Sequence, residues 1–297
     1  MGTVPVRFTM PPEAGGNVRG MIPSYELNDG TTLPAIGFGT YPLRGADGVE
    51  SLISALHTGY RLIDSAVNYE NEGAVGEAVR RSGVPREEIV ITSKLPGRHH
   101  GYADATAAVR ESAYRLGVEQ IDLYLIHWPN PITGRYVEAW QALVDAQRAG
   151  VLRTIGVSNF LPEHLDAIIA ATGVTPAVNQ VELHPYFPQV AQRASHAELG
   201  VRTESWSPLG RAGEVFADPV ITAIASAHGR TPSQVVLRWQ VQLGSVPLPK
   251  AASAERQAEN LAVFDFELAD DEVAAITALG RPDGRLFGAD PASHEEM

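Results

Sequence analysis

The stretch RLIDSAVNYENEGAVG, residues 61–76, places an acid and a phenol where an apolar strand gives way to a helix. The two residues before Asp64 are apolar, as in a strand covered on both faces, and Asn71 or the acids beside it can cap the helix. Asp64 is therefore predicted at the C-terminal end of a strand, with Tyr69 in the loop above it. Ligands and reacting groups collect at that edge in parallel α/β folds. Taken alone, the stretch favours a simpler interpretation, in which Asp64 caps a helix and Tyr69 is a loop aromatic.

The length and composition of the chain suit one large domain. It has 297 residues, of which 44% are hydrophobic, and a barrel domain uses about 250 residues. The formal net charge of -12 argues against a surface for nucleic acid or an anionic membrane, because both need clustered positive charge. The chain has no cysteine, which excludes disulfides and thiolate chemistry.

The two ends of the chain differ in composition from the rest. Residues 1–23 are rich in Pro and Gly and lack the apolar run of a signal peptide or a membrane helix. They are predicted to form a flexible leader on a cytoplasmic, monomeric protein whose residues 24–297 form the folded domain. Residues 281–297 are predicted to form a tail over the active-site face of that domain.

Short apolar runs alternate with amphipathic helices along most of the chain, a pattern typical of parallel strands joined by crossover helices. A hairpin over residues 25–33, which turns at Asp29 and Gly30, precedes them and is predicted to plug the bottom of the fold. The predicted strands cover residues 35–38, 62–64, 89–94, 121–126, 154–157, 178–182, 202–206 and 246–249. The predicted helices include 48–57, 103–116, 136–149, 162–171, 189–198 and 232–242, with two extra helices at 219–227 and 269–278. Eight such strands predict a single (β/α)8 TIM barrel, an α/β fold.

Four reactive side chains, those of Asp64, Tyr69, Lys94 and His127, are predicted at one rim of this barrel. Lys94 is one of only two lysines among 23 basic residues, the other being Lys250. A chain that uses arginine almost everywhere else keeps lysine where a guanidinium cannot replace a compact ammonium. Each residue has a simpler interpretation, since Lys94 can snorkel and a lone histidine is most often a core residue. Their joint placement at one rim favours a catalytic role for the four residues over these simpler interpretations.

The chemistry that suits this set is protonation of a carbonyl oxygen. A nearby ammonium stabilises a phenolate, and a carboxylate can hold that ammonium in place. Tyr69, Lys94 and Asp64 fit these roles. His127, if neutral with one N–H turned inward, can hydrogen-bond the carbonyl oxygen. Such a set needs a hydride donor to complete the reaction.

Motifs spread over residues 25–278 resemble those of the aldo-keto reductases, which bind a nicotinamide cofactor in a (β/α)8 barrel. They are GFGTY (37–41), IDSAVNY (63–69), ITSK (91–94), LIHWP (125–129), GVSNF (156–160), NQVELHP (179–185) and WSPLG (206–210). The resemblance implies an NADPH-dependent enzyme that reduces aldehydes, ketones or dicarbonyls. It makes Tyr69 the general acid, Lys94 and Asp64 the residues that tune it, and His127 the residue that orients the carbonyl. Tyr41 and Trp128 remain as apolar walls of the substrate pocket.

The resemblance also implies the residues that hold the cofactor. They are Gly39, Thr40, Tyr41 and Asp64 along its flank, Ser158, Asn159 and Gln180 at the carboxamide, Trp206 under the nicotinamide ring, Ser207 and Leu209 at the pyrophosphate, Lys250 and Arg256 at the 2′-phosphate, and Glu259 and Asn260 at the adenine. The tryptophan at 206, where many relatives carry tyrosine, resembles the bacterial branch that includes 2,5-diketo-D-gluconate reductases.

Two positions depart from the family pattern. Ala251 stands where the family usually has serine, so one hydroxyl contact to the 2′-phosphate is missing. Pro96 stands where many relatives carry a tryptophan that narrows the pocket, which implies a wider mouth.

Other functional classes fit less well. If a dinucleotide-binding fingerprint began at Gly37, its third glycine would fall at position 42, which is proline. This argues against a Rossmann fold. The histidines at 99, 100, 127 and 184 lack the spacing of metal ligands. The alternative that remains is a catalytically weak NADP(H)-binding sensor or regulatory protein, because a fold alone never secures catalysis.

Overall fold

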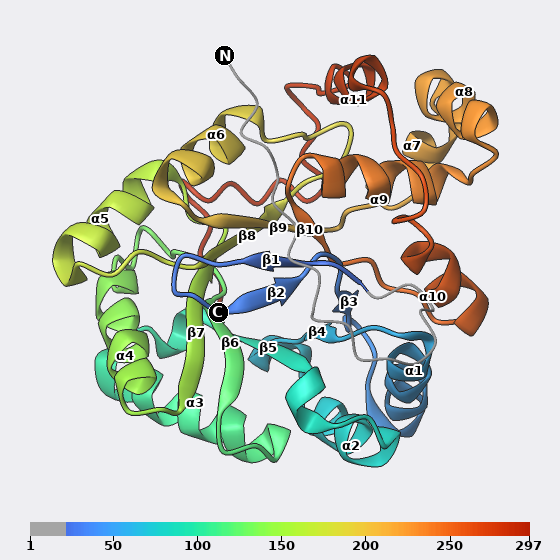
Figure 1. The fold of residues 1–297 in the computed structure, drawn as a ribbon. Helices are drawn as coiled ribbons and strands as arrows, with labels where there is room; N and C mark the ends of the chain where they lie inside the picture. The colour runs from blue at the N-terminus through green and yellow to red at the C-terminus, as the bar shows by residue number, and fades with distance from the viewer. Residues whose placement is uncertain (1–21) are drawn as a thin grey trace.

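A computed structural model describes residues 22–297 of the chain (Figure 1). Nearly all of the predicted leader, residues 1–23, therefore lies outside the described residues. No helix in the described part of the chain is long and apolar enough to cross a membrane.

Eight parallel strands form one sheet in the order in which they occur in the chain. They are β3 (Phe38–Gly39), β4 (Leu62–Asp64), β5 (Val90–Leu95), β6 (Ile121–Ile126), β7 (Leu152–Ser158), β8 (Val178–Glu182), β9 (Arg202–Trp206) and β10 (Val246–Pro247). The amides of Gly37 and Gly39 donate to the carbonyl oxygens of Pro247 and Pro249, at 3.0 and 3.1 Å. These bonds join the first strand to the last, so the sheet closes into the predicted (β/α)8 barrel.

Helices surround this barrel (Figure 1). They are α1 (Gly45–Thr58), α2 (Glu72–Ser82), α3 (Tyr102–Leu116), α4 (Tyr136–Arg148), α5 (Pro162–Thr172), α6 (Val190–Leu199), α9 (Pro232–Gln242) and α10 (Ala254–Leu261). The two predicted extra helices are α8 (Pro219–His228) and α11 (Asp270–Thr277), and a short helix that was not predicted is α7 (Gly213–Ala217). Asp218 and Thr231 set the starts of α8 and α9, because their side chains accept hydrogen bonds from amides of the first turn. Each is followed by a proline, which suits the first position of a helix.

The predicted hairpin covers the barrel end at which the strands begin. Strands β1 (Ser24–Glu26) and β2 (Thr32–Pro34) pair antiparallel, with Tyr25 opposite Leu33. Both side chains are buried in a cluster that includes Val178 and Val246, the first residues of β8 and β10. The amide of Ala35 donates to Pro23 of the hairpin at 2.8 Å. The first barrel strand therefore starts at Phe38, later than predicted.

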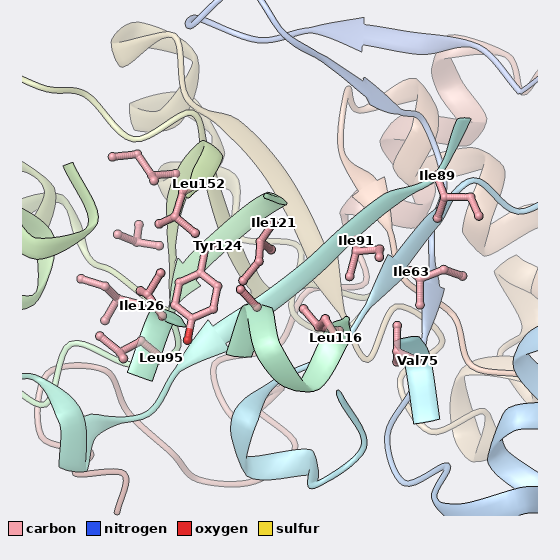
Figure 2. Close-up of a cluster of buried hydrophobic side chains, with 14 of the residues drawn as sticks. Ile63, Val75, Ile89, Ile91, Leu95, Leu116, Ile121, Tyr124, Ile126 and Leu152 are labelled. Atoms are coloured by element: carbon pink, nitrogen blue, oxygen red, sulfur yellow. The ribbon is translucent and has the colours of Figure 1, made fainter. Parts of the chain in front are cut away.

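A layer of buried apolar side chains holds the helices against the strands that carry Asp64 and Lys94. Figure 2 shows Ile63, Ile91 and Ile121 on β4, β5 and β6, near Val75 of α2 and Leu116 of α3. Full burial of one such side chain stabilises the fold by about 1.5–3 kcal/mol. The strand ends that carry the predicted reactive groups are thus fixed by the core behind them.

Candidate active site

Asp64, Lys94 and Tyr69 meet at the end of the barrel where the strands finish. Lys94 is fully buried, and its Nζ donates to Asp64 Oδ1 at 2.7 Å and to the carbonyl oxygen of Ser65 at 2.8 Å. The same Nζ lies 3.5 Å from the Tyr69 hydroxyl. The structure therefore brings together the three residues that the sequence predicted to act as a unit.

Burial and charge oppose each other at this site. Burial raises the pKa of the Tyr69 phenol and the Lys94 ammonium lowers it, and the net shift is upward. Burial disfavours the charged form of Lys94, but the charges of Asp64 and Tyr69 outweigh this, so the pKa of Lys94 is also raised. The expected effect of Lys94 on Tyr69 is present, although burial exceeds it. At neutral pH Tyr69 therefore holds its proton beside a charged ammonium.

His127 follows β6 and faces the same space. Its amide donates to the carbonyl oxygen of Leu95 at 2.9 Å, and the ring centroids of His127 and Tyr69 are 5.8 Å apart. A cavity of about 510 Å³ opens here, lined by His127, Tyr69 and Asp64 together with the predicted walls Tyr41 and Trp128. A proton donor and an imidazole thus share one cavity with two aromatic side chains.

The predicted carboxamide site consists of side chains that orient one another. Asn159 donates through Nδ2 to the carbonyl oxygen of His127 at 3.0 Å and accepts at Oδ1 from Trp206 Nε1 at 2.9 Å. Ser158 Oγ donates to the carbonyl oxygen of Gln180 at 2.9 Å. Asn159, Gln180 and Trp206 line the cavity, whereas Ser158 is buried behind it. Hydrogen bonds thus fix where the amides of Asn159 and Gln180 face.

Glu204 is a second buried carboxyl group in the barrel, and the sequence interpretation missed it. Gln180 Nε2 donates to Asp64 Oδ2 at 2.9 Å and to Glu204 Oε2 at 3.0 Å. Burial, followed by the charge of Asp64, raises the pKa of Glu204 to about 8. Side chains alternate along a strand, so its place two residues before Trp206 on β9 was the signal that it points into the barrel.

The cavity lining also includes residues predicted along the flank of the cofactor and at its phosphates. Gly39, Thr40, Ser207, Leu209 and Lys250 all line it. Lys250 and Arg256 are exposed, and neither forms an ion pair with a carboxylate among residues 22–297. An exposed cation in the cavity lining, Lys250, and a second exposed cation on α10, Arg256, suit a phosphorylated ligand.

Glu259 and Asn260, which are predicted at the adenine, both form hydrogen bonds within the protein. The Glu259 carboxylate accepts from Thr231 Oγ1 and Ser233 Oγ, both at 2.6 Å, across the start of α9. Asn260 is only 4% exposed and bonds to Tyr60. Contacts between α10 and its neighbours therefore occupy the side chains that were expected to reach the adenine.

The C-terminal residues complete the wall of the cavity. Phe287 lines it, and Glu296 Oε1 lies 2.7 Å from His127 Nδ1. Pro96 is buried and is not part of the lining, and the neighbouring Gly97 amide donates to Glu296 at 3.3 Å. The tail therefore packs against the segment after Pro96, and the wider mouth stays a prediction.

No group of three or more His, Asp or Glu side chains within the described residues is placed to hold a metal ion.

Residues 35–281 match the Aldo/keto reductase family. The chain belongs to this family. It is 55% identical over 276 residues to 2,5-diketo-D-gluconic acid reductase B of Corynebacterium sp. (strain SHS752001), covering 93% of this chain and 99% of that protein. The predicted class of enzyme, an oxidoreductase acting on carbonyl groups, is thereby confirmed.

Solved aldo-keto reductases share the fold. A variant of Gox0644 in complex with NADPH has a TM-score of 0.87 and 45% identity, with 92% of this chain and 98% of that chain covered. An aldo-keto reductase of Bombyx mori in complex with NADP has a TM-score of 0.85 and 32% identity, with 93% and 98% covered. Both relatives were solved with the type of cofactor that the sequence predicts for this chain.

Proposed function

We propose that this protein is an NADPH-dependent aldo-keto reductase that reduces an aldehyde, ketone or dicarbonyl to an alcohol, with Tyr69 as the general acid. The observation that carries the proposal is the buried contact chain from Asp64 through Lys94 to the Tyr69 hydroxyl, at 2.7 and 3.5 Å. It ends in a cavity that also holds His127. A buried ammonium beside a phenol that faces a cavity stabilises the phenolate left after proton transfer.

In the proposed reaction the phenol of Tyr69 gives its proton to the carbonyl oxygen as negative charge develops there. Lys94 stabilises the resulting phenolate, and Asp64 holds Lys94 in position. His127 orients the carbonyl oxygen toward Tyr69, while Tyr41 and Trp128 contact the apolar part of the substrate. A positioned general acid of this kind contributes about 10² to 10⁴ to the rate.

The residues present fit the proposed cofactor. The cavity offers an aromatic wall in Trp206, an amide in Gln180 and a cation in Lys250, with Arg256 exposed nearby in sequence. When bound, NADPH supplies the hydride. Lys250 and Arg256 would hold its 2′-phosphate, and Ser158, Asn159 and Gln180 its carboxamide. The buried amide Nε2 of Gln180 is committed to Asp64 and Glu204, which leaves its oxygen to accept a hydrogen bond from a ligand.

The test is the oxidation of NADPH by a panel of aldehydes, ketones and dicarbonyls, with the alcohol product identified chemically. We expect turnover with several members of the panel and little with NADH. Tight NADPH binding without any alcohol product would instead support the sensor or regulatory alternative.

A further inference from the structure

The carboxylate of Glu296 lies beside His127, which lines the cavity. Its Oε1 is 2.7 Å from His127 Nδ1 and accepts from Asn68 Nδ2 at 2.7 Å, and its Oε2 accepts from the Gly97 amide at 3.3 Å. Burial alone would raise the pKa of Glu296, but His127 and these donors outweigh burial, and the net shift is downward. Glu296 also acts electrostatically on Tyr69. A negative charge therefore stands beside both residues proposed to act on the carbonyl.

The main chain at Glu296 is bound to the loop after β6. Asn130 Nδ2 donates to the Glu296 carbonyl oxygen at 2.6 Å, and the Glu296 amide donates to Asn130 Oδ1 at 3.1 Å. A Cβ at Gly97 would lie 2.3 Å from the same carbonyl oxygen. The loop after β5 thus has room for the tail because residue 97 carries no side chain.

The residues before Glu296 add further contacts to the same loop. Glu295 accepts from the Ile132 amide at 2.7 Å, and the rings of Trp128 and His294 are 4.3 Å apart. These contacts hold the end of the tail, and the Glu296 carboxylate with it, against the loop after β6 that carries the lining residues His127 and Trp128.

The cations nearby are already engaged or lie across the barrel. Lys94 is paired with Asp64 at 2.7 Å. Arg98 donates to Asn68 Oδ1 and to the main-chain oxygen of Met297. The cations that line the cavity, Arg211 and Lys250, follow β9 and β10 on the opposite side of the barrel. The carboxylate of a substrate bound near His127 would therefore face Glu296, and no unpaired cation among these described residues lies beside it to offset the repulsion.

We infer that Glu296 is a specificity-determining residue that disfavours substrates that carry a carboxylate and so favours neutral aldehydes and ketones. Like charges repel more strongly between the poorly polarisable walls of a cavity than in water. This inference rests on the proposed function.

The experiment compares two aldehydes that differ in charge and little in shape, 4-carboxybenzaldehyde and methyl 4-formylbenzoate, in the full chain with NADPH. The measured quantity is the ratio of kcat/KM for the acid to kcat/KM for the ester. We expect Glu296→Gln to raise this ratio by about fivefold or more, because it removes one repulsive charge. The ester is the internal reference, so that an effect of the substitution on His127, which acts on both substrates, cancels in this ratio.

Glu295→Gln is the matched control, because Glu295 is the adjacent carboxylate and contacts Ile132 and Thr133 instead of His127. We expect it to leave the ratio within about twofold of wild type. Glu296→Ala removes the same charge without an amide and should raise the ratio as Glu296→Gln does.

An unchanged ratio in both Glu296 variants would overturn the inference. An equal rise of kcat/KM for the acid and the ester would also overturn it, because it would show that the tail only obstructs access to the cavity. In either case the wild-type protein still reduces the ester, so the proposed function stands. Failure of the wild-type protein to reduce either aldehyde would overturn the proposed function and, with it, this inference.

Discussion

The two sides of the active-site cavity are held in place by different kinds of contact. On one side, Asp64 is the last residue of β4 and Lys94 the next-to-last of β5, and they pair in register with Thr92 of β5 and Leu125 of β6. On the other side, Glu296 is held by side-chain hydrogen bonds from Asn68 and Asn130. The strand side carries the proposed proton transfer, and the tail side carries the residue proposed to influence the choice of substrate. Substitutions on the strand side should therefore affect every substrate, and those on the tail side should alter the choice among substrates.

The largest effect is expected for Lys94→Arg on the strand side. A guanidinium keeps the charge, but it is larger and planar and cannot take the place of an ammonium 2.7 Å from Asp64 and 3.5 Å from Tyr69. We expect turnover to fall by about 10² to 10⁴ with all substrates. NADPH affinity should stay within a few-fold, as measured by fluorescence titration. Aldehyde reduction within about tenfold of wild type, with an unchanged pH dependence, would show that Lys94 does not tune Tyr69.

The next effect concerns the cofactor end of the cavity, where Lys250 is exposed. Lys250→Ala should weaken NADPH binding by at least about tenfold, because a charge-assisted contact to a phosphate contributes about 1.5 to 3 kcal/mol. NADH lacks the 2′-phosphate and serves as the control, so its affinity should not change. Equal losses for NADPH and NADH would place Lys250 away from the phosphate.

Glu204→Gln tests the buried carboxyl group that adjoins the strand side. Its pKa is raised from 4.5 to about 8 in the folded protein, so the folded state binds more protons than the unfolded state between these values. Its contribution to stability is full below pH 4.5 and is lost as the pH rises toward about 8, at up to about 1.4 kcal/mol per pH unit. Glutamine does not titrate. The Tm of the variant relative to wild type should therefore rise from pH 5 to pH 8, and a constant difference would show that Glu204 is ionised throughout.

The smallest effect on turnover is expected for Gly97→Ala on the tail side. The added Cβ would lie 2.1 Å from Asn130 Nδ2 and 2.3 Å from the Glu296 carbonyl oxygen, so the tail must shift. We expect kcat for a small aldehyde to change by about threefold or less, while KM for a bulky ketone changes more. Gly73→Ala is the matched control, because its Cβ would have no contact closer than 4.0 Å. Equal KM changes for both substrates would mean that the tail does not shape the pocket.

The strand side could be predicted from the sequence because local patterns define where each strand ends. The predicted ranges 121–126, 178–182 and 202–206 coincide with β6, β8 and β9. Once these ends are known, Lys94 and His127 must lie at one rim, because parallel strands finish at the same edge of a sheet. Glu204 was equally accessible to this reasoning through its alternation with Trp206.

The tail side could not be predicted in the same way. The bonds of Glu296 to Asn130 and Asn68 join residues separated by 166 and 228 positions. No periodicity or motif links residues so far apart. The hydrogen bonds of Glu259 are a similar case, since its partners Thr231 and Ser233 lie at the start of another helix and packing of the two helices decides where the carboxylate points.

The central claim is that Tyr69 donates the proton, and Tyr69→Phe tests it most directly because only the hydroxyl group is removed. The measurement combines NADPH titration with turnover of methyl 4-formylbenzoate. We predict NADPH affinity within a few-fold of wild type and a loss of about 10² to 10⁴ in kcat. Turnover within about tenfold of wild type, with NADPH bound as tightly, would contradict the assignment of Tyr69 as the general acid.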